Sequence, residues 1–281
     1  MRTLPLFVAM LGGCSFSATA PATSDSPVVI DGPISDAAID AKLPDAAIDA
    51  GPGRVAGAQA QWKFNEGMGQ IAADSAGLTP SYDLTRNPAT VVNTEWSNGG
   101  LTFKAGPTPQ LIQGSYAASA VRLIRATTTC LANKTATLEA WIAPSNETQG
   151  ISPRPVIIAG ITANINSRSF EIAQVGRNII ARTRTDTPNA QDLQAMDVVT
   201  AGTLIHVALV QEQATQRLYI NGVEKDSQVS PLMAWAAYSM YVGGDIGVNA
   251  PWLGTARAVV LYCSALTSAQ VQGNFAFGPT L

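Results

Sequence analysis

The hydrophobic positions between residues 203 and 228 predict two strands and a tight hairpin. From Thr203 to Val210 apolar residues occupy both alternating faces, which is typical of a strand buried on both sides. From Gln216 to Ile220 they occupy every second position, which favours a strand with one solvent-facing side. Asn221-Gly222 tolerates the positive φ angles of a two-residue type I′ turn. Val223 to Gln228 are therefore predicted to fold back along the preceding strand.

Short apolar runs of the same kind recur through residues 55–281 and predict one all-β domain. Gly, Pro, Thr, Ser and Asn are abundant between the runs, as in the turns of such folds. Many short strands joined by turns favour a two-sheet antiparallel jelly-roll sandwich. One short C-terminal helix is predicted at Ser268–Phe275, because Thr267 can cap it. The predicted strands are Gln61–Phe64, Leu101–Lys104, Thr137–Ala143, Val156–Ile161, Ser169–Val175, Asn178–Arg184, Thr203–Gln211, Gln216–Ile220, Val223–Gln228, Tyr238–Gly243 and Thr255–Cys263.

The first 14 residues have the composition of an export signal. One basic residue is followed by an apolar run, Leu4–Leu11, two glycines and Cys14. This ending resembles the lipobox of bacterial lipoproteins, which implies removal of residues 1–13 and acylation of Cys14. Several acyl chains would anchor the protein stably to a membrane. Ser15 supplies no acidic retention signal, so we expect an outer-membrane lipoprotein of the bacterial cell envelope. The alternative is a plain secretory signal followed by a chance cysteine.

Residues 14–54 differ in composition from the rest of the chain. They are rich in Ala, Asp, Pro and Ser, and they repeat Asp-Ala-Ala-Ile-Asp-Ala at 36–41 and 45–50. A segment of this composition cannot bury a hydrophobic core, so a disordered acidic tether is predicted. Residues 1–54 hold six acidic and three basic residues, which leaves 14 of each in residues 55–281. A nucleic-acid partner is not supported, because the predicted domain has no basic excess.

Five motifs, in order along the chain, resemble laminin-G-like domains of the concanavalin-A-like jelly-roll fold. They are Trp62–Gly67, Thr137–Ile142, His206–Ala208, Leu218–Gly222 and the closing stretch from Trp252 to Gly278. The resemblance covers residues 60–279. It implies a module that binds a glycan or a surface protein, or an accessory module of a larger enzyme.

The residues of the predicted central strand argue against catalysis. Glu139 and Trp141 project from one face, as they would in a sugar-binding or sugar-cleaving cleft. Jelly-roll glucanases that this fold resembles carry Glu-x-Asp-x-x-Glu on such a strand, whereas this chain has Trp141 and Pro144 at the second and third positions. His206 is the only histidine and is predicted to pack in the core. We therefore expect binding without catalysis, and the alternative is a glycan hydrolase with an unrecognised carboxylate pair.

Several side chains are candidates for contacting a ligand. Trp96 and Trp235 lie in loop-like stretches and could stack on sugar rings, although aromatic residues in sandwiches are mostly buried. Arg182 and Arg184 share one strand face and could meet an acidic glycan, unless they are simply solvated. Glu139 could accept a hydrogen bond from a sugar hydroxyl.

Two aspartates and two cysteines complete the candidate residues. Asp74 and Asp245 lie in glycine-rich loops, where laminin-G-like domains can hold calcium; turn-stabilising roles are the alternative. No other cofactor is expected. Cys130 and Cys263 form an even pair if Cys14 is acylated and the protein is exported. The resemblance places them side by side, as a disulfide or as two buried thiols.

Overall fold

The structure is a computed structural model that describes residues 54–279 apart from 89–90, 98, 106–116, 153–154, 165–166, 185–191, 230–232 and 245–250. These residues belong to one compact unit, Ala50–Leu281. The predicted signal, Cys14, the predicted tether up to residue 53, and Asp245 lie outside the described residues. Among those that are described, no helix is long and apolar enough to cross a membrane.

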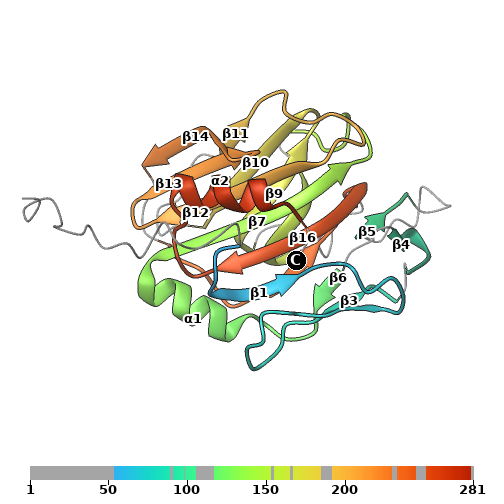
Figure 1. Ribbon diagram of the computed structural model, residues 1–281, viewed down its shortest axis with the longest axis horizontal. Coiled ribbons are helices and arrows are strands. Elements are labelled where there is room, and N and C mark those ends of the chain that lie inside the picture. Colours follow the sequence, from blue (N-terminus) through green and yellow to red (C-terminus); the bar gives the residue numbers. More distant parts are fainter. Residues whose placement is uncertain are drawn as a thin grey trace, which may run out of the picture. The chain divides into compact units, whose positions relative to one another are not determined.

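Two antiparallel sheets form the domain, which confirms the predicted all-β sandwich (Figure 1). Sheet A contains, in spatial order, β14 (Val223–Val229), β13 (Thr215–Ile220), β12 (Ile205–Glu212), β7 (Thr135–Pro144), β16 (Gly254–Tyr262), β5 (Gly100–Phe103) and β4 (Thr94–Ser97), with β1 (Ala58–Trp62) also paired to β16. Sheet B contains β11 (Leu193–Ala195), β10 (Asn178–Thr183), β9 (Ser167–Val175), β8 (Val156–Asn164), β15 (Ser239–Val242), β6 (Ala117–Ser119), β3 (Leu84–Arg86) and β2 (Ile71–Ala72). The helical elements are η2 (Val91–Asn93), α1 (Ile124–Asn133) and α2 (Ser268–Phe277).

Each predicted strand corresponds to an observed strand, with ends that differ by at most three residues. The sequence patterns did not predict α1 or the strands β2, β3, β4, β6 and β11. These five strands have two to four residues each, which is too short for a period of two to be recognisable. In α1 three consecutive threonines lower the helix propensity, and no side chain caps the N-terminus.

The predicted hairpin is confirmed between β13 and β14. Asn221 and Gly222 have φ angles of 51° and 78°, the positive values that a type I′ turn requires at both central residues. The turn also packs against α2, because a Cβ atom on Gly222 would lie 3.2 Å from the Cα of Gln272. Glycine at this position therefore serves both the turn and the close approach of the helix.

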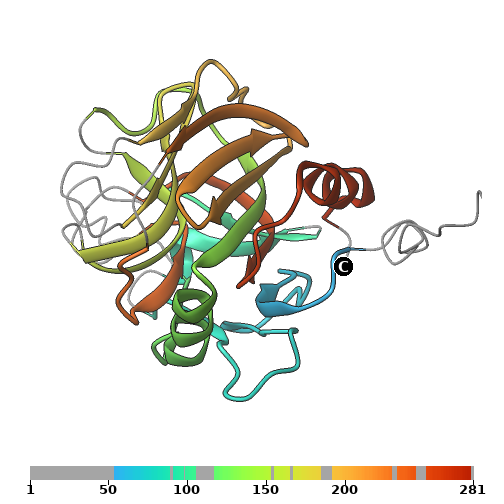
Figure 2. The same cartoon turned by 90° about the vertical axis from the view of Figure 1, so that its left-hand side faces the viewer.

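The central strands of sheet A, β12, β7 and β16, are buried on both faces. The inner face of sheet A packs against sheet B around a core that includes Phe103, Phe170 and Trp252. Its outer face carries a second apolar cluster, which includes Val260 on β16 and Val271 on α2. Figure 2 shows α2 on this outer side of the sheet. The predicted burial of both faces of the strand at residues 203–210 is thereby explained.

The C-terminal helix is confirmed, and Thr267 is its N-cap. The Thr267 hydroxyl accepts a hydrogen bond from the Gln270 N–H, and the Gln270 side chain accepts one from the Thr267 N–H, which makes a capping box. A disulfide joins Cys130 on α1 to Cys263, the residue after β16, across 133 residues of sequence. Of the two alternatives left open for these cysteines, the structure has the bridge.

Candidate functional site

The strand predicted to carry a sugar-binding face, β7, presents that face toward α2. Glu139 and Trp141 project from the outer side of sheet A, as their spacing predicts. In the sheet, Trp141 lies opposite His206 on β12, so their side chains share this face. Asn274 reaches the same place from α2. The face is therefore covered by the helix.

Both carboxylate oxygens of Glu139 are occupied by residues of this chain. Oε1 lies 3.2 Å from His206 Nε2, and Oε2 accepts a hydrogen bond of 2.8 Å from Asn274 Nδ2. Glu139 is 0% exposed. The structure thus places this predicted ligand contact inside the molecule. His206 is 1% exposed, which confirms that it packs in the interior.

Arg54 completes the group around Glu139. Its guanidinium lies 4.1 Å from the centroid of the Trp141 ring, and Trp141 stacks on His206 with centroids 4.2 Å apart. Burial lowers the pKa of Arg54, while the negative charge of Glu139 acts in the opposite direction. Burial raises the pKa of the Tyr262 hydroxyl, and Glu139 raises it further. We call Arg54, Glu139, Trp141, His206, Tyr262 and Asn274 the Glu139 cluster.

A charged cluster lies on the outer face of sheet B. Arg182, Glu171, Gly160 and Tyr241 follow one another across β10, β9, β8 and β15 in register. A Cβ atom on Gly160 would lie 2.8 Å from the Cβ of Glu171, so glycine leaves room for the carboxylate. The sequence patterns did not single out Glu171, although it lies on the same alternating face of its strand as Ser169 and Ala173.

Arg182 links two carboxylates in this sheet B cluster. Its guanidinium contacts Glu171 at 3.1 Å and Asp192 at 2.7 Å, and Arg168 contacts Glu171 at 3.0 Å. Glu171 is 0% exposed, whereas the Arg182 side chain is 27% exposed. The predicted partner Arg184 is exposed, with Nη1 3.5 Å from the Tyr238 hydroxyl. Arg182 and Arg184 are the predicted ligand contacts that reach the surface here.

Trp96, Trp235 and Trp252 occupy different environments. Trp235 is 6% exposed and packs on Phe170, so its ring faces the core. Trp96 is partly buried, and its Nε1 donates to the carbonyl of Gly69. Trp252 is 0% exposed and lies in the core. Of the two predicted stacking residues, only Trp96 is partly open to solvent.

The carboxylate of Asp74 stabilises a turn. Its Oδ1 accepts hydrogen bonds from the N–H groups of Gln61 and Ala76, and its Oδ2 accepts one from the N–H of Tyr82. The contact two residues ahead is an Asx turn, which was the alternative to a calcium ligand. Within the described ranges there is no group of three or more His, Cys, Asp or Glu side chains that could hold a metal ion.

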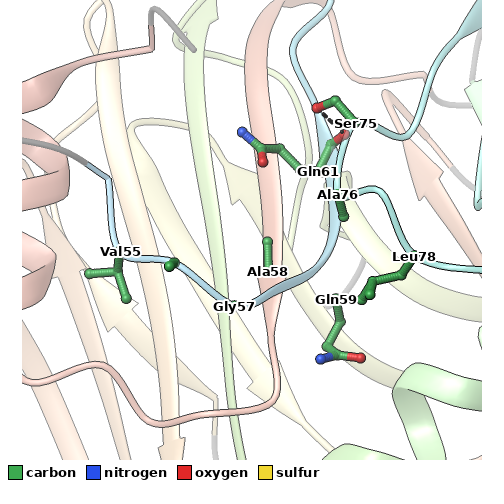
Figure 3. A pocket seen from close by; sticks show the side chains of 9 residues that line it. Val55, Gly57, Ala58, Gln59, Gln61, Ser75, Ala76 and Leu78 are labelled. Atoms are coloured by element: carbon green, nitrogen blue, oxygen red, sulfur yellow. Dashed lines mark hydrogen bonds between the residues drawn. The ribbon is translucent and has the colours of Figure 1, made fainter.

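A hollow of about 320 Å³ lies beside β1 (Figure 3). It is lined by the chain from Val55 to Gln59 together with Gln61, Ser75, Ala76 and Leu78. The lining carries no charged side chain. Figure 3 shows the side chains of Gln59 and Leu78 on the same side of the strand.

A laminin-G family model, described as the concanavalin A-like lectin/glucanases superfamily, matches residues 113–272. The chain belongs to this superfamily. The match begins before α1 and includes both β7 and β12, so the strands of the Glu139 cluster are part of the family fold. No curated protein matches the chain significantly.

Solved structures of two different kinds share the fold. Trypanosoma rangeli sialidase in complex with 2,3-difluoro-KDN is 19% identical with a TM-score of 0.58, over 78% of this chain and 32% of the sialidase. The binding domain of botulinum neurotoxin serotype D is 13% identical with a TM-score of 0.58, over 79% of this chain and 52% of that domain. This superfamily member thus spans a third to a half of these relatives, and at such identities they share its fold alone.

Proposed function

We propose that this protein is a binding module that recognises a carbohydrate or a protein ligand without turning it over. The observation that carries the proposal is that Glu139, Glu171 and Asp192 are engaged by other residues of the protein. Glycoside hydrolysis normally needs two carboxyl groups about 5 to 10 Å apart that face the sugar. Glu139 is instead covered by α2, and Arg182 binds both Glu171 and Asp192. Superfamily membership supports the choice of ligand classes.

We place the ligand on the outer face of sheet B, near Arg182 and Arg184. Arg184 is exposed, and its Nη1 lies 3.5 Å from the hydroxyl of Tyr238. A guanidinium so placed suits an acidic group, because it can donate two parallel hydrogen bonds to a carboxylate. An acidic glycan is therefore the preferred carbohydrate.

Binding and turnover are separated by one experiment on the purified full chain. It is incubated with a panel of neutral and acidic polysaccharides, with and without EDTA, and scored both for retention and for released reducing ends. We expect retention without release, and a loss of retention of about tenfold in Arg184→Ala, the size of one charge-assisted contact. Arg177→Ala, which removes another half-exposed arginine, is the control.

Three outcomes would change this view. Release of sugar that Glu171→Gln abolishes would establish a hydrolase with the carboxylates of the sheet B cluster as its catalytic pair. Loss of retention in EDTA would show a requirement for a divalent cation. Retention that is equal in wild type and Arg184→Ala would move the ligand away from sheet B.

The cellular placement is also a proposal. The lipobox-like Cys14 supports a lipid anchor in a bacterial envelope, and the Cys130–Cys263 bridge is a feature of exported proteins. We predict that Cys14→Ala moves the protein from the membrane fraction to the soluble fraction, measured by immunoblot after fractionation. Cys14→Ala protein that stays membrane-bound would contradict the anchor.

A further inference from the structure

We propose that Arg54–Val55, which are the N-terminal residues of the described domain, and helix α2 form a single strap across the outer face of sheet A, docked through Glu139. In this strap neither segment stays fully docked without the other. The proposal concerns the covered face of sheet A and is independent of any ligand on sheet B.

Direct bonds join the two segments, which are more than 200 residues apart in sequence. Arg54 Nη2 donates to the carbonyl of Gly278 at 2.7 Å, immediately after α2. The N–H of Val55 donates to Asn274 Oδ1 at 3.0 Å. The N-terminal residues are therefore attached to the middle and to the C-terminal end of the helix.

Asn274 connects both segments to the sheet. Its amide oxygen accepts the bond from Val55, and its amide nitrogen donates to Glu139 Oε2 at 2.8 Å. Asn274 is 1% exposed, so this chain of bonds runs through the interior. One side chain thus links the N-terminal residues, α2 and β7.

Helix α2 has few apolar contacts with the sheet, namely those of Val271 and a ring contact between Phe275 and His206 with centroids 6.0 Å apart, so its polar contacts matter. Of its ten residues, Val271 and Asn274 are the buried ones. A helix of ten residues is only marginally stable by itself in water. Loss of the Arg54 and Val55 bonds therefore removes two of the polar contacts that hold α2 in place.

Charge also couples the two segments. Arg54 supplies a positive charge near the buried carboxylate of Glu139, and this carboxylate acts on Arg54 electrostatically. Removing a cation that acts on a buried carboxylate makes it more costly to keep that carboxylate in a region of low dielectric constant. Without Arg54, exposure of Glu139 by movement of α2 becomes more favourable.

Several buried polar atoms around the strap lack a hydrogen-bond partner within the described ranges. Buried atoms of three residues in the Glu139 cluster have no hydrogen-bond partner among the described residues: Arg54 Nε and Nη1, Trp141 Nε1 and His206 Nδ1. Unpaired buried groups favour conformations in which water can reach them. Such openings are local events that hydrogen exchange detects.

Hydrogen exchange followed by mass spectrometry on the full chain tests the coupling. We compare wild type, Arg54→Ala and the control Arg177→Ala, and follow peptides from α2 and from α1. Arg54→Ala is expected to speed exchange in α2 by about tenfold or more, because local opening then breaks fewer bonds. Exchange in α1 stays unchanged, as it does throughout Arg177→Ala.

The reciprocal variant completes the test. Asn274→Ala is expected to speed exchange at residues 55–58 while α1 keeps its protection, since Val55 loses its acceptor. Unchanged protection of α2 in Arg54→Ala overturns the strap. So does faster exchange in α1 in either variant, because that would show a general loss of stability rather than coupling between these two segments.

Discussion

At the scale of single residues, Tyr262 is a buried phenol whose hydroxyl interacts with Glu139 and Asn274 but makes no hydrogen bond of normal geometry with the described residues. We predict that Tyr262→Phe changes the free energy of unfolding at pH 8 by less than about 1 kcal/mol, because no hydrogen bond of normal geometry is lost. Tyr219→Phe is the matched control. Its hydroxyl lies 3.0 Å from the Ser268 hydroxyl, so this substitution should cost about 1 kcal/mol.

The same residue gives a pH dependence. Burial, and then the charge of Glu139, raises the pKa of Tyr262 in the folded state. The contribution of Tyr262 to the free energy of unfolding is therefore intact below its pKa in the unfolded chain, about 10, and falls as the pH rises above that value. Urea unfolding at pH 8 and pH 10.5 should show a smaller alkaline loss in Tyr262→Phe than in wild type. An equal loss in both proteins would contradict a neutral, buried Tyr262.

The orientation and burial of residues on the central strands were predicted more successfully than the contacts that these residues make. The shared face of Glu139 and Trp141 follows from their spacing, and the interior position of His206 follows from its apolar neighbours. That Asn274 donates to Glu139 has no local signal, since the two residues are 135 positions apart. The Glu139 carboxylate was therefore predicted as a possible ligand contact, whereas in the structure it accepts a hydrogen bond from Asn274 on α2.

At the scale of elements, the capping box of α2 makes a testable contribution. Thr267→Ala removes the acceptor for the Gln270 N–H and is expected to lower the free energy of unfolding by about 1 kcal/mol. Thr267→Ser keeps the hydroxyl and should remain close to wild type. Urea titration of the three proteins measures both effects. A loss in Thr267→Ser as large as that in Thr267→Ala would show that the methyl group, rather than the cap, is what matters.

The two helices show which elements a sequence can reveal. Helix α2 was predicted because Thr267 can cap it and because Val271, Asn274 and Phe275 fall on one side. Helix α1 has no capping side chain, and only Ala126, Thr127 and Cys130 are buried in it. Its position depends on packing and on the bridge to Cys263, which no local pattern contains.

At the scale of the whole molecule, the disulfide joins residues that are 133 positions apart. A bridge that closes so long a loop restricts the unfolded chain strongly. We predict that Cys130→Ala/Cys263→Ala lowers the free energy of unfolding by about 3–5 kcal/mol. A reducing agent should destabilise the wild type and leave the double variant unchanged. Two free thiols in the exported wild-type protein would contradict the bridge.

The sequence by itself determined the all-β class, the order of eleven of the strands, the Asn221-Gly222 hairpin and the capped C-terminal helix. These features depend on residues close together in the chain, through side-chain alternation, positive φ angles and a cap. The tertiary structure alone decided which face α2 covers, which residues occupy Glu139, and that Arg182 binds Glu171 and Asp192. Those partners come from strands and helices that meet only when the sheets assemble, and the energy of a buried charge depends on that assembly.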